Sequence, residues 1–370
     1  MTGSHPVYLD YNASTPIKPA AVAAMTELLG RVGNASSVHG FGRQARRAVE
    51  TAREQVAALV GAKPAQVVFT ASGTEANNLA LRGFPERAVL VSAIEHESVL
   101  RAAPDAPRIP VTADGVVDLT ALEALLVAAG RPALISVMLA NNETGVVQPI
   151  AEVAALGHRH GALVHCDAVQ APGRVALDLA ALGVDLVTVS SHKCGGPQGA
   201  AALIARHDPA ALVVGGGQER GRRAGTENVA ALAGFGVAAE LAHAELAEAP
   251  SIARLRDALE TRVRALSNRA AVIGAGQARL PNTSCIALPG AKAETQVMAL
   301  DLAGIAVSAG SACSSGKVAA SHVLAAMGLP RRIAGAAIRV SLGWASRDGD
   351  IDRFVAAWGA LAARPARPEA

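Results

Sequence analysis

The sequence is poor in aromatic residues and in cysteine. Phe, Trp and Tyr make up 2% of the 370 residues, so Ala, Val and Leu must fill the core. So few aromatic rings argue against a platform on which single-stranded nucleic acid stacks its bases. Four cysteines in a chain of this length do not make a disulfide framework, and none are spaced as Cys-x-x-Cys. Most of these thiols are therefore expected to be buried and reduced.

A strong net charge and a long apolar run are also lacking. The 34 Lys and Arg exceed the 31 Asp and Glu by only three, too few to indicate a nucleic-acid partner. Arg131 interrupts the most apolar stretch, residues 124–140, and residues 1–10 lack a basic head followed by an apolar run. We therefore expect a cytoplasmic protein without a membrane-spanning segment. At 51% hydrophobic residues the chain is not disordered.

Short β-branched runs alternate with helix-period segments between about residues 65 and 205. The runs are apolar throughout, which is typical of strands covered on both faces. They are residues 67–69, 89–91, 134–137, 162–164 and 186–189. This alternation predicts an α/β fold with a mostly parallel sheet between helices. Beyond residue 250 the pattern becomes that of a smaller α+β unit, so we expect a large domain over residues 16–250 and a small one from residues 1–15 and 251–370.

Two charged residues follow neighbouring strands of the predicted sheet. Lys193 comes directly after the strand at 186–189 and can form a Schiff base with an aldehyde cofactor, although an ordinary solvated lysine fits the same place. Asp167 follows the strand at 162–164 and can hold a pyridinium nitrogen protonated, or it can be a helix cap. Ligands of such sheets bind beyond the carboxyl ends of the strands.

A third motif, residues 70–75, lies between a strand and a helix. Ser72 and Glu75 fit a capping box, which alone explains the motif. The glycine and the hydroxyls also suit a phosphate bound at the helix N-terminus. A phosphate loop, a carboxylate and a lysine, each after a strand and in this order, match the needs of pyridoxal 5′-phosphate.

Cys313 lies in a segment of small residues, 308–316, after a short predicted strand. A cysteine among glycines and serines is not expected in a core, and an accessible thiol there can act as a nucleophile. A surface loop with an incidental cysteine is the alternative.

Together these motifs resemble the cysteine desulfurases of the nitrogen-fixation and iron–sulfur-cluster-assembly type, within the class-V aminotransferase-like enzymes. The resemblance covers nearly the whole chain and implies the fold type I of pyridoxal-phosphate-dependent transferases, with a seven-stranded, mostly parallel sheet. It is carried by residues 8–16, 33–39, 73–78, 95–96, 141–145, 165–170, 191–193, 215–226 and 338–342, together with the Cys313 segment.

The resemblance implies a role for each matched residue near the ring of the cofactor. Lys193 would be the Schiff-base lysine and proton shuttle, and Cys313 the nucleophile that collects sulfur as a persulfide. Asp167 would pair with the pyridinium nitrogen, Gln170 would bond the phenolic oxygen, and His96 would stack on the ring and help to move protons.

It also implies the residues that hold the phosphate and the substrate. The phosphate would be held by Gly73, Thr74, Ser190 and His192. Thr226 would reach the phosphate of the other subunit of a homodimer. Arg339 would bind the substrate carboxylate with help from Asn12 and Asn142, the latter also contacting the cofactor. No metal is implied.

The implied reaction converts L-cysteine to L-alanine and passes sulfane sulfur to an acceptor protein, for iron–sulfur cluster assembly or tRNA thiolation. A lyase acting on selenocysteine or another β-substituted alanine is the alternative enzyme, and Cys313 separates the two because elimination needs no protein thiol. A non-catalytic sulfur-relay scaffold is the alternative of another class, and the joint presence of Lys193, Asp167, His96 and Cys313 speaks against it. Cys194, unusual for the family, is expected to be an inert buried thiol.

Overall fold

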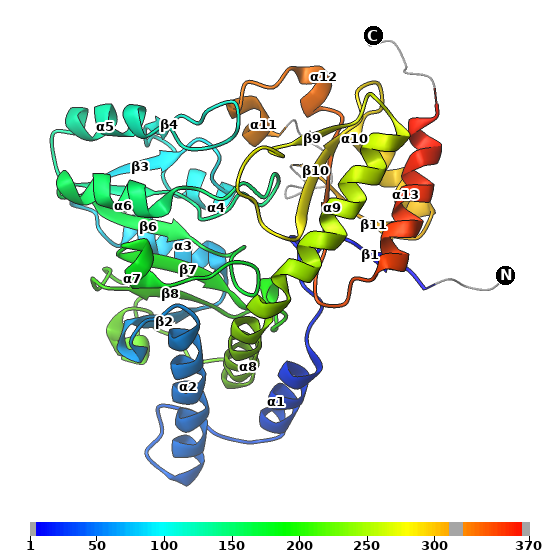
Figure 1. The fold of residues 1–370 in the computed structure, drawn as a ribbon. Coiled ribbons are helices and arrows are strands. Elements are labelled where there is room, and N and C mark those ends of the chain that lie inside the picture. Colours follow the sequence, from blue (N-terminus) through cyan, green and yellow to red (C-terminus); the bar gives the residue numbers. More distant parts are fainter. Residues whose placement is uncertain (1–4, 311–320, 365–370) are drawn as a thin grey trace.

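The computed structural model describes residues 5–310 and 321–364 and is built around two principal sheets (Figure 1). A seven-stranded sheet forms the larger part of the molecule. Its strands, in spatial order, are β2 (Val67–Thr70), β8 (Ala201–Ala205), β7 (Leu186–Ser190), β6 (Leu163–Asp167), β5 (Ala133–Ser136), β3 (Ala88–Ser92) and β4 (Arg108–Ile109). Neighbours from β7 to β4 are parallel, whereas β8 is antiparallel to both β2 and β7. The predicted mostly parallel sheet is therefore confirmed.

The helices of this part connect and cover the strands. They are α1 (Pro19–Leu29), α2 (Gly40–Leu59), α3 (Gly73–Arg82), α4 (Glu97–Leu100), α5 (Leu119–Ala128), α6 (Ile150–Arg159), α7 (Leu179–Leu182), α8 (Val229–Glu245) and α9 (Ala249–Leu266), with short 3₁₀ turns η1 (Pro64–Gln66), η2 (Ser191–Lys193), η3 (Gln218–Gly221) and η4 (Leu246–Glu248). Several begin at a side-chain cap: the carboxylate of Asp118 accepts two backbone N–H bonds at the start of α5, and Asp178 does the same for α7.

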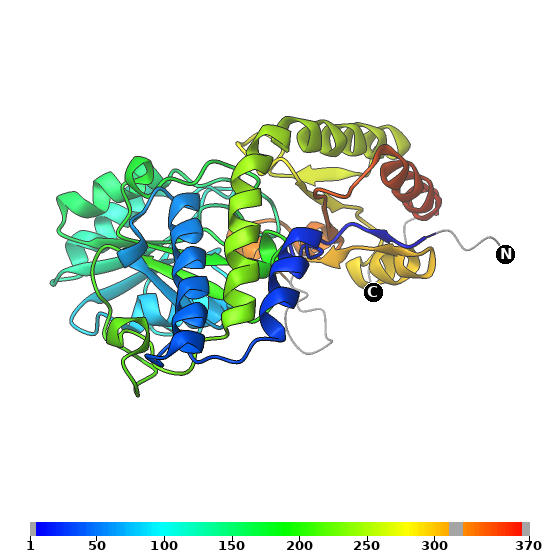
Figure 2. The ribbon, with the colours of Figure 1, turned by 90° about the horizontal axis from the view of Figure 1, so that it is seen from below.

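The seven-stranded sheet is buried on both faces, as its continuously apolar strands indicate. Val67 and Phe69 of β2 join a core beneath α2, α5, α6 and α8, whereas Val68 between them joins a second core beneath α3 and α4. Figure 2 shows α2 and α8 side by side over the first face, next to α1. Small residues fill most of these cores, and the ring of Phe235 on α8 meets that of Phe69 edge-on. Phe69 and Phe235 are thus among the few aromatic residues that the core contains.

The second principal sheet is antiparallel and has the order β12 (Ser308–Ala309), β13 (Ala337–Ser341), β10 (Thr283–Ala287) and β9 (Ala271–Ile273). Its helices are α10 (Ala293–Leu302), α11 (His322–Ala326), α12 (Arg331–Ala334) and α13 (Asp348–Ala362). β1 (Val7–Tyr8) pairs in parallel with β11 (Ile305–Ala306), and Leu9 is buried in the same core as Trp358. The domain boundaries near residues 15 and 250 stay a proposal.

The expectation that the chain has no long apolar run was wrong. The helical stretch Val229–Leu266 is long and apolar enough, by length and composition alone, to cross a membrane. Pro250 does not end it, because a proline is tolerated in the first turn of α9. Half of its most apolar window is buried inside the protein, and α8 packs against α1 and α2. In this fold it serves as a core helix.

A buried ion pair holds the glycine-rich segment at 215–226 against the large sheet. Glu219 has a φ of 48°, in the left-handed region that non-glycine residues rarely adopt. Its carboxylate accepts two bonds from Arg53, at 2.7 and 2.8 Å, and a third from the Phe69 backbone N–H at 2.9 Å. The Arg53 guanidinium also lies over the Phe69 ring. These contacts offset the backbone strain at Glu219.

We expect Arg53→Met to lower the free energy of unfolding by roughly 3–5 kcal/mol, because it leaves the Glu219 carboxylate buried without its partner. Urea denaturation followed by far-ultraviolet circular dichroism measures the change. Arg31→Met is the matched control, since Arg31 pairs with Glu27 where both side chains are more than half exposed. The control should change stability by less than about 1 kcal/mol. Equal effects of both substitutions would contradict the role of the buried pair.

Candidate active site

The predicted site residues lie at the ends of neighbouring elements of the large sheet. β6 ends at Asp167, and β7 ends at Ser190, directly before the turn η2 that carries Lys193. α3 begins at Gly73 three residues after β2, and His96 caps α4 shortly after β3. The carboxyl ends of the parallel strands β3, β6 and β7 share one edge of the sheet, and that edge is where ligands of such sheets bind.

The Asp167 carboxylate is buried and fixed by two hydrogen bonds. Its Oδ2 accepts from Asn77 Nδ2 at 2.7 Å, and its Oδ1 accepts from the Val169 N–H at 3.0 Å. Asn77 also donates to Ser98 Oγ at 2.9 Å. Sequence reasoning assigned no role to Asn77, although it lies four residues after Gly73 and therefore on the same face of α3.

His96 lies close enough to Asp167 and Lys193 for both charges to affect its pKa. Its Nδ1 accepts from the Ser98 N–H at 3.1 Å and lies 2.8 Å from Ser98 Oγ. Burial lowers the pKa of His96, the Asp167 carboxylate opposes this shift, and the Lys193 ammonium adds to it. The structure thus brings these three predicted residues together, with an imidazole held neutral at ordinary pH.

Lys193 and Gln170 meet at one backbone carbonyl. Lys193 Nζ donates to the carbonyl oxygens of Asn12 and Ala13, at 2.5 and 3.0 Å. Gln170 Nε2 donates to the same Asn12 oxygen at 3.0 Å, and Gln170 Oε1 accepts from the buried guanidinium of Arg174. The segment around Asn12 therefore lies directly against the lysine end of the site. Arg174 is a further contact that the sequence did not reveal.

The expected capping box at the start of α3 is present. The Ser72 hydroxyl accepts from the Glu75 N–H at 3.1 Å, and the Glu75 carboxylate accepts from the Ala71 N–H at 2.8 Å. The N–H groups of Gly73 and Thr74 have no acceptor within the helix, because the first turn of any helix lacks one. The motif can therefore cap α3 and also bind a phosphate, because the two roles use different groups.

The backbone at Gly73 lies close to the end of β7. A Cβ added at Gly73 would come 3.3 Å from Val169 Cγ2 and 3.6 Å from Ser190 Cβ. A side chain there would crowd the space between α3 and the strand ends, next to the two free N–H groups. Glycine keeps this concave surface open to an anion.

Two further predicted phosphate residues, His192 and Thr226, come from the turn after β7 and from the segment before α8. His192 Nδ1 is 3.3 Å from Ser14 Oγ, and burial, with the nearby Lys193 charge, lowers the pKa of His192 to about 4. Thr226 is exposed on the segment before α8. That segment is tied to the start of α3, because Arg223 Nε donates to Glu75 Oε1 at 2.7 Å.

Arg339 on β13 is buried, as expected, and its anionic partner lies within the chain. Nη2 pairs with Asp10 Oδ1 at 2.7 Å, and Nη1 donates to the carbonyl of Asn142 at 3.1 Å. The same carbonyl accepts from Asn12 Nδ2 at 3.1 Å, so the three predicted substrate residues meet. Arg339 Nε is buried and has no hydrogen-bond partner in residues 5–310 and 321–364. Asp10, which lies inside the recognised motif at 8–16, was missed.

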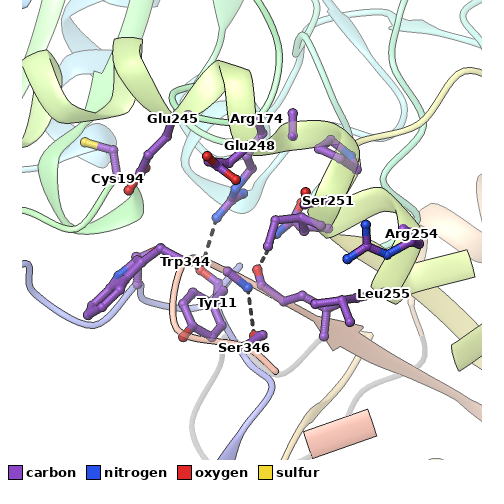
Figure 3. Close-up of a pocket in the computed structure, with 18 of the residues that line it drawn as sticks. Tyr11, Arg174, Cys194, Glu245, Glu248, Ser251, Arg254, Leu255, Trp344 and Ser346 are labelled. Carbon is purple, nitrogen blue, oxygen red and sulfur yellow. Dashed lines mark hydrogen bonds between the residues drawn. The ribbon is translucent and has the colours of Figure 1, made fainter. Parts of the chain in front are cut away.

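A cavity of about 390 Å³ adjoins the lysine turn (Figure 3). Among the predicted site residues in the described part of the chain, Lys193 alone lines it; Asp167 and His96 do not. Its walls come from the junction of α8 and α9 and from the segment at residues 342–348. The thiol of Cys194 also lines it, and burial raises the pKa of that thiol to about 11, as expected of an inert cysteine.

Cys313 lies outside the described residues. The other cysteines, Cys166, Cys194 and Cys285, are all buried, and burial raises the pKa of each. None of those three thiols is suited to nucleophilic attack at neutral pH, so Cys313 stays the predicted nucleophile.

A model of the family described as Aminotransferase class-V matches residues 7–354. The chain belongs to this family. A class-V relative, the cysteine desulfurase of Cereibacter sphaeroides, is 43% identical over 366 residues and 94% of each chain. The IscS-like cysteine desulfurase of Mycobacterium tuberculosis is 40% identical over 366 residues and 93% of each chain. A solved NifS-like protein from Rickettsia africae superposes with a TM-score of 0.90 at 38% identity, covering 96% of this chain and 99% of that one.

These similarities confirm the resemblance to cysteine desulfurases, the fold type I and the cofactor, pyridoxal 5′-phosphate, which this class-V group uses. The residues present fit that cofactor. The N–H groups at the start of α3, which have no acceptor within the helix, suit its phosphate. The buried Asp167 carboxylate suits its ring nitrogen, and the Lys193 amine suits its aldehyde. Because Gly73 lies beside Ser190 at the end of β7, and Lys193 follows β7 directly, one molecule can meet all of them.

A second buried carboxylate lies near Asp167. Glu95 Oε1 accepts from Ser92 Oγ at 2.8 Å and from the Met138 N–H at 2.7 Å. Burial and the neighbouring Asp167 charge raise the pKa of Glu95 from 4.5 to about 8. Two carboxylates this close do not both ionise readily, so Glu95 is held neutral while Asp167 carries the charge.

We expect Glu95→Gln to flatten the dependence of stability on pH between about 4.5 and 8. In that window the unfolded chain loses the Glu95 proton and the folded chain keeps it, so wild-type stability falls as pH rises, by up to about 1.4 kcal/mol per pH unit from this group. Melting temperatures at pH 5 and pH 8 measure the difference. The exposed Glu123→Gln variant is the control and should keep the wild-type slope. An unchanged slope in Glu95→Gln would show that Glu95 is ionised in the fold.

Proposed function

We propose that the chain is a homodimeric L-cysteine desulfurase, a sulfurtransferase that converts L-cysteine to L-alanine and keeps the sulfur as a persulfide on Cys313. The observation that carries the proposal is that Asp167, Lys193 and His96 all lie at the carboxyl ends of strands of the large sheet. A cofactor held between a carboxylate and a lysine amine fits this arrangement, in a chain whose relatives are cysteine desulfurases. A cytoplasmic location is part of the proposal.

When bound, pyridoxal 5′-phosphate supplies an electron sink for the bonds around the substrate α-carbon. Asp167 supports it by keeping a negative charge at the ring nitrogen, and Asn77 keeps that carboxylate in place. The Lys193 amine moves protons at the α-carbon, with the neutral His96 imidazole as a second proton carrier. For Gln170 to bond the phenolic oxygen, its Nε2 must exchange its present bond to the Asn12 carbonyl.

The phosphate end is assigned to the start of α3 and the end of β7. Its residues are Gly73, Thr74, Ser190 and His192. Thr226 is exposed on a segment anchored to Glu75, a placement that suits contact with a second subunit. Exposed apolar side chains before and at the start of α2, Val32, Val38 and Phe41, also favour an interface with a second subunit.

Arg339 is assigned to the carboxylate of the substrate. Its guanidinium already holds one carboxylate, that of Asp10, and the unpaired Nε leaves a donor for a second anion. Asn12 and Asn142 lie beside it and supply amide groups. The substrate is thereby held at its carboxylate while its α-carbon faces Lys193.

Cys313 is assigned to sulfur transfer. Its thiolate attacks the sulfur of bound L-cysteine, a sulfur–sulfur bond forms as the carbon–sulfur bond breaks, and the electron pair of the broken bond stays with the carbon skeleton. That skeleton takes up a proton and leaves as alanine, so no outside oxidant is needed. The sulfane sulfur then passes to an acceptor protein, for cluster assembly or tRNA thiolation.

We expect brief exposure of the enzyme to L-cysteine to add sulfur atoms to the peptide that contains Cys313. Mass spectrometry of the digested protein detects the added mass. The Cys313→Ala variant should keep the cofactor absorbance and bind L-cysteine, but should form neither sulfide nor alanine beyond one equivalent per enzyme.

Two controls accompany this experiment. Lys193→Ala should lose the absorbance of the covalently held cofactor, and Cys194→Ala should behave as the wild type because Cys194 is buried. Full multiple-turnover activity in Cys313→Ala would remove the nucleophile assignment and favour the lyase alternative. Absence of any reaction in the wild type would favour the scaffold alternative.

We expect Arg339→Ala to raise KM for L-cysteine about tenfold or more, because a charge-assisted bond to the substrate carboxylate is lost. The cofactor absorbance should stay intact. Steady-state kinetics and absorbance spectra measure the two effects, and Arg262→Ala, from an exposed pair with Asp352, is the control. Loss of the absorbance with an unchanged KM would assign Arg339 a structural role.

A further inference from the structure

A buried carboxylate next to the substrate residues has no part in the mechanism above. Glu143 follows Asn142 in the chain and is buried. Its Oε2 accepts a hydrogen bond from Ser321 Oγ at 2.5 Å. Ser321 in turn caps α11, because its Oγ accepts from the Leu324 N–H at 3.1 Å. Glu143 is thereby joined to the start of α11.

The same carboxylate oxygen also lies against Gly310. A Cβ added at Gly310 would come 2.6 Å from Glu143 Oε2 and 3.3 Å from Ser321 Cβ. Gly310 and Ser321 border residues 311–320, the segment whose sequence contains Cys313. Glu143 Oε2 therefore bonds to Ser321 at one border of the cysteine segment and lies close to Gly310 at the other.

Burying the Glu143 carboxyl group lowers the stability of the fold, so we ask which contact the group provides in return. Burial raises the pKa of Glu143 from 4.5 to about 7, against the opposing effects of the Ser321 hydrogen bond and of the nearby Arg339 charge. A non-polar side chain of similar size would avoid this cost. The contact to Ser321 is what the carboxyl group provides and an apolar side chain does not.

Adjacent residues connect the substrate group to the border of the cysteine segment. The carbonyl of Asn142 holds Arg339 Nη1, and the side chain of Glu143 holds Ser321. A second bond supports this border, since His322 Nε2 lies 2.9 Å from the carbonyl oxygen of Glu95, the residue before His96. The start of α11 is thus fixed to two segments of the candidate site.

We propose that Glu143 is a positioning residue for sulfur transfer: its hydrogen bond to Ser321, packed close to Gly310, fixes the borders of the Cys313 segment relative to Arg339. The inference rests on the role proposed above for Cys313. It assigns Glu143 to the sulfur-transfer step alone, and neither to cofactor binding nor to substrate binding.

The test uses the holoenzyme and compares Glu143→Ala, Glu143→Gln and Ser321→Ala. We expect Glu143→Ala to slow sulfur addition to the Cys313 peptide in a single turnover by about fivefold or more, the effect of one hydrogen bond on an equilibrium. The cofactor absorbance and its change on binding L-cysteine should stay as in the wild type. Glu143→Gln should recover most of the rate, because the amide oxygen still accepts from Ser321.

A second readout needs no reaction with the substrate. Alkylation of Cys313 by iodoacetamide, followed by mass spectrometry, should be about fivefold faster in Glu143→Ala than in the wild type, since one hydrogen bond no longer holds the border. Ser321→Ala should give a similar change, and the double variant should show less than the product of the two effects, as expected for two residues in one contact. Glu123→Ala, an exposed acid on α5, is the control.

The outcomes separate this inference from the proposed function. Unchanged sulfur addition and unchanged alkylation in Glu143→Ala would overturn the inference, as would multiplicative effects in the double variant. If Glu143→Ala fails to fold, Ser321→Ala replaces it, and a wild-type rate in Ser321→Ala overturns the inference. If the wild type adds no sulfur to Cys313, the proposed function fails, whereas a change in alkylation would still show that Glu143 fixes the segment borders.

Discussion

The buried negative charge of Asp167 is the constraint on which the candidate site depends. Two donors, Asn77 Nδ2 and the Val169 N–H, stabilise this charge, while Glu95 nearby stays neutral because burial raises its pKa to about 8. If both carboxylates were ionised, their repulsion would destabilise the strand ends that carry them. With Glu95 neutral, a single negative charge is left at the end of β6, where the proposed cofactor site lies. It also moderates the low pKa of His96.

The segment at residues 10–12 contacts both principal sheets and so joins them next to the candidate site. Asp10 binds Arg339 of β13 and accepts from Ser308 Oγ of β12, whereas the Asn12 carbonyl accepts from Lys193 beyond β7. The Asn12 side chain donates to Thr283 of β10 at 2.9 Å. Arg339 and Lys193, which come from distant parts of the sequence, are thus held by Asp10 and Asn12, so a shift of this segment would move both side chains.

The sequence predicted what local patterns determine and missed what tertiary contacts determine. Apolar runs revealed five strands of the large sheet, but β8, Ala-Ala-Leu-Ile-Ala, has little of the β-branched character that marks a strand and forms because β2 and β7 pair with it. Motifs placed Lys193 and Asp167 after their strands. The contacts that hold the site residues come from elsewhere in the sequence: Asn77 is 90 positions from Asp167, and Asp10 is 329 positions from Arg339. No local pattern encodes such contacts.

The buried polar groups near Arg339 differ in what they contribute to the fold. Asp10 neutralises the guanidinium, so the fold is stable without substrate, while the unpaired Nε keeps a desolvated donor that only an added acceptor satisfies. Glu143 differs from Arg339, because its Oε2 accepts a hydrogen bond from Ser321 within the chain. The same oxygen lies close to Gly310, so both borders of the cysteine segment are near it. A guanidinium with a donor left for a ligand therefore lies next to a carboxylate whose hydrogen bond is made within the described part of the chain. Because Asn142 and Glu143 are adjacent in the sequence, a shift of the backbone there would move the contacts of both Arg339 and Ser321.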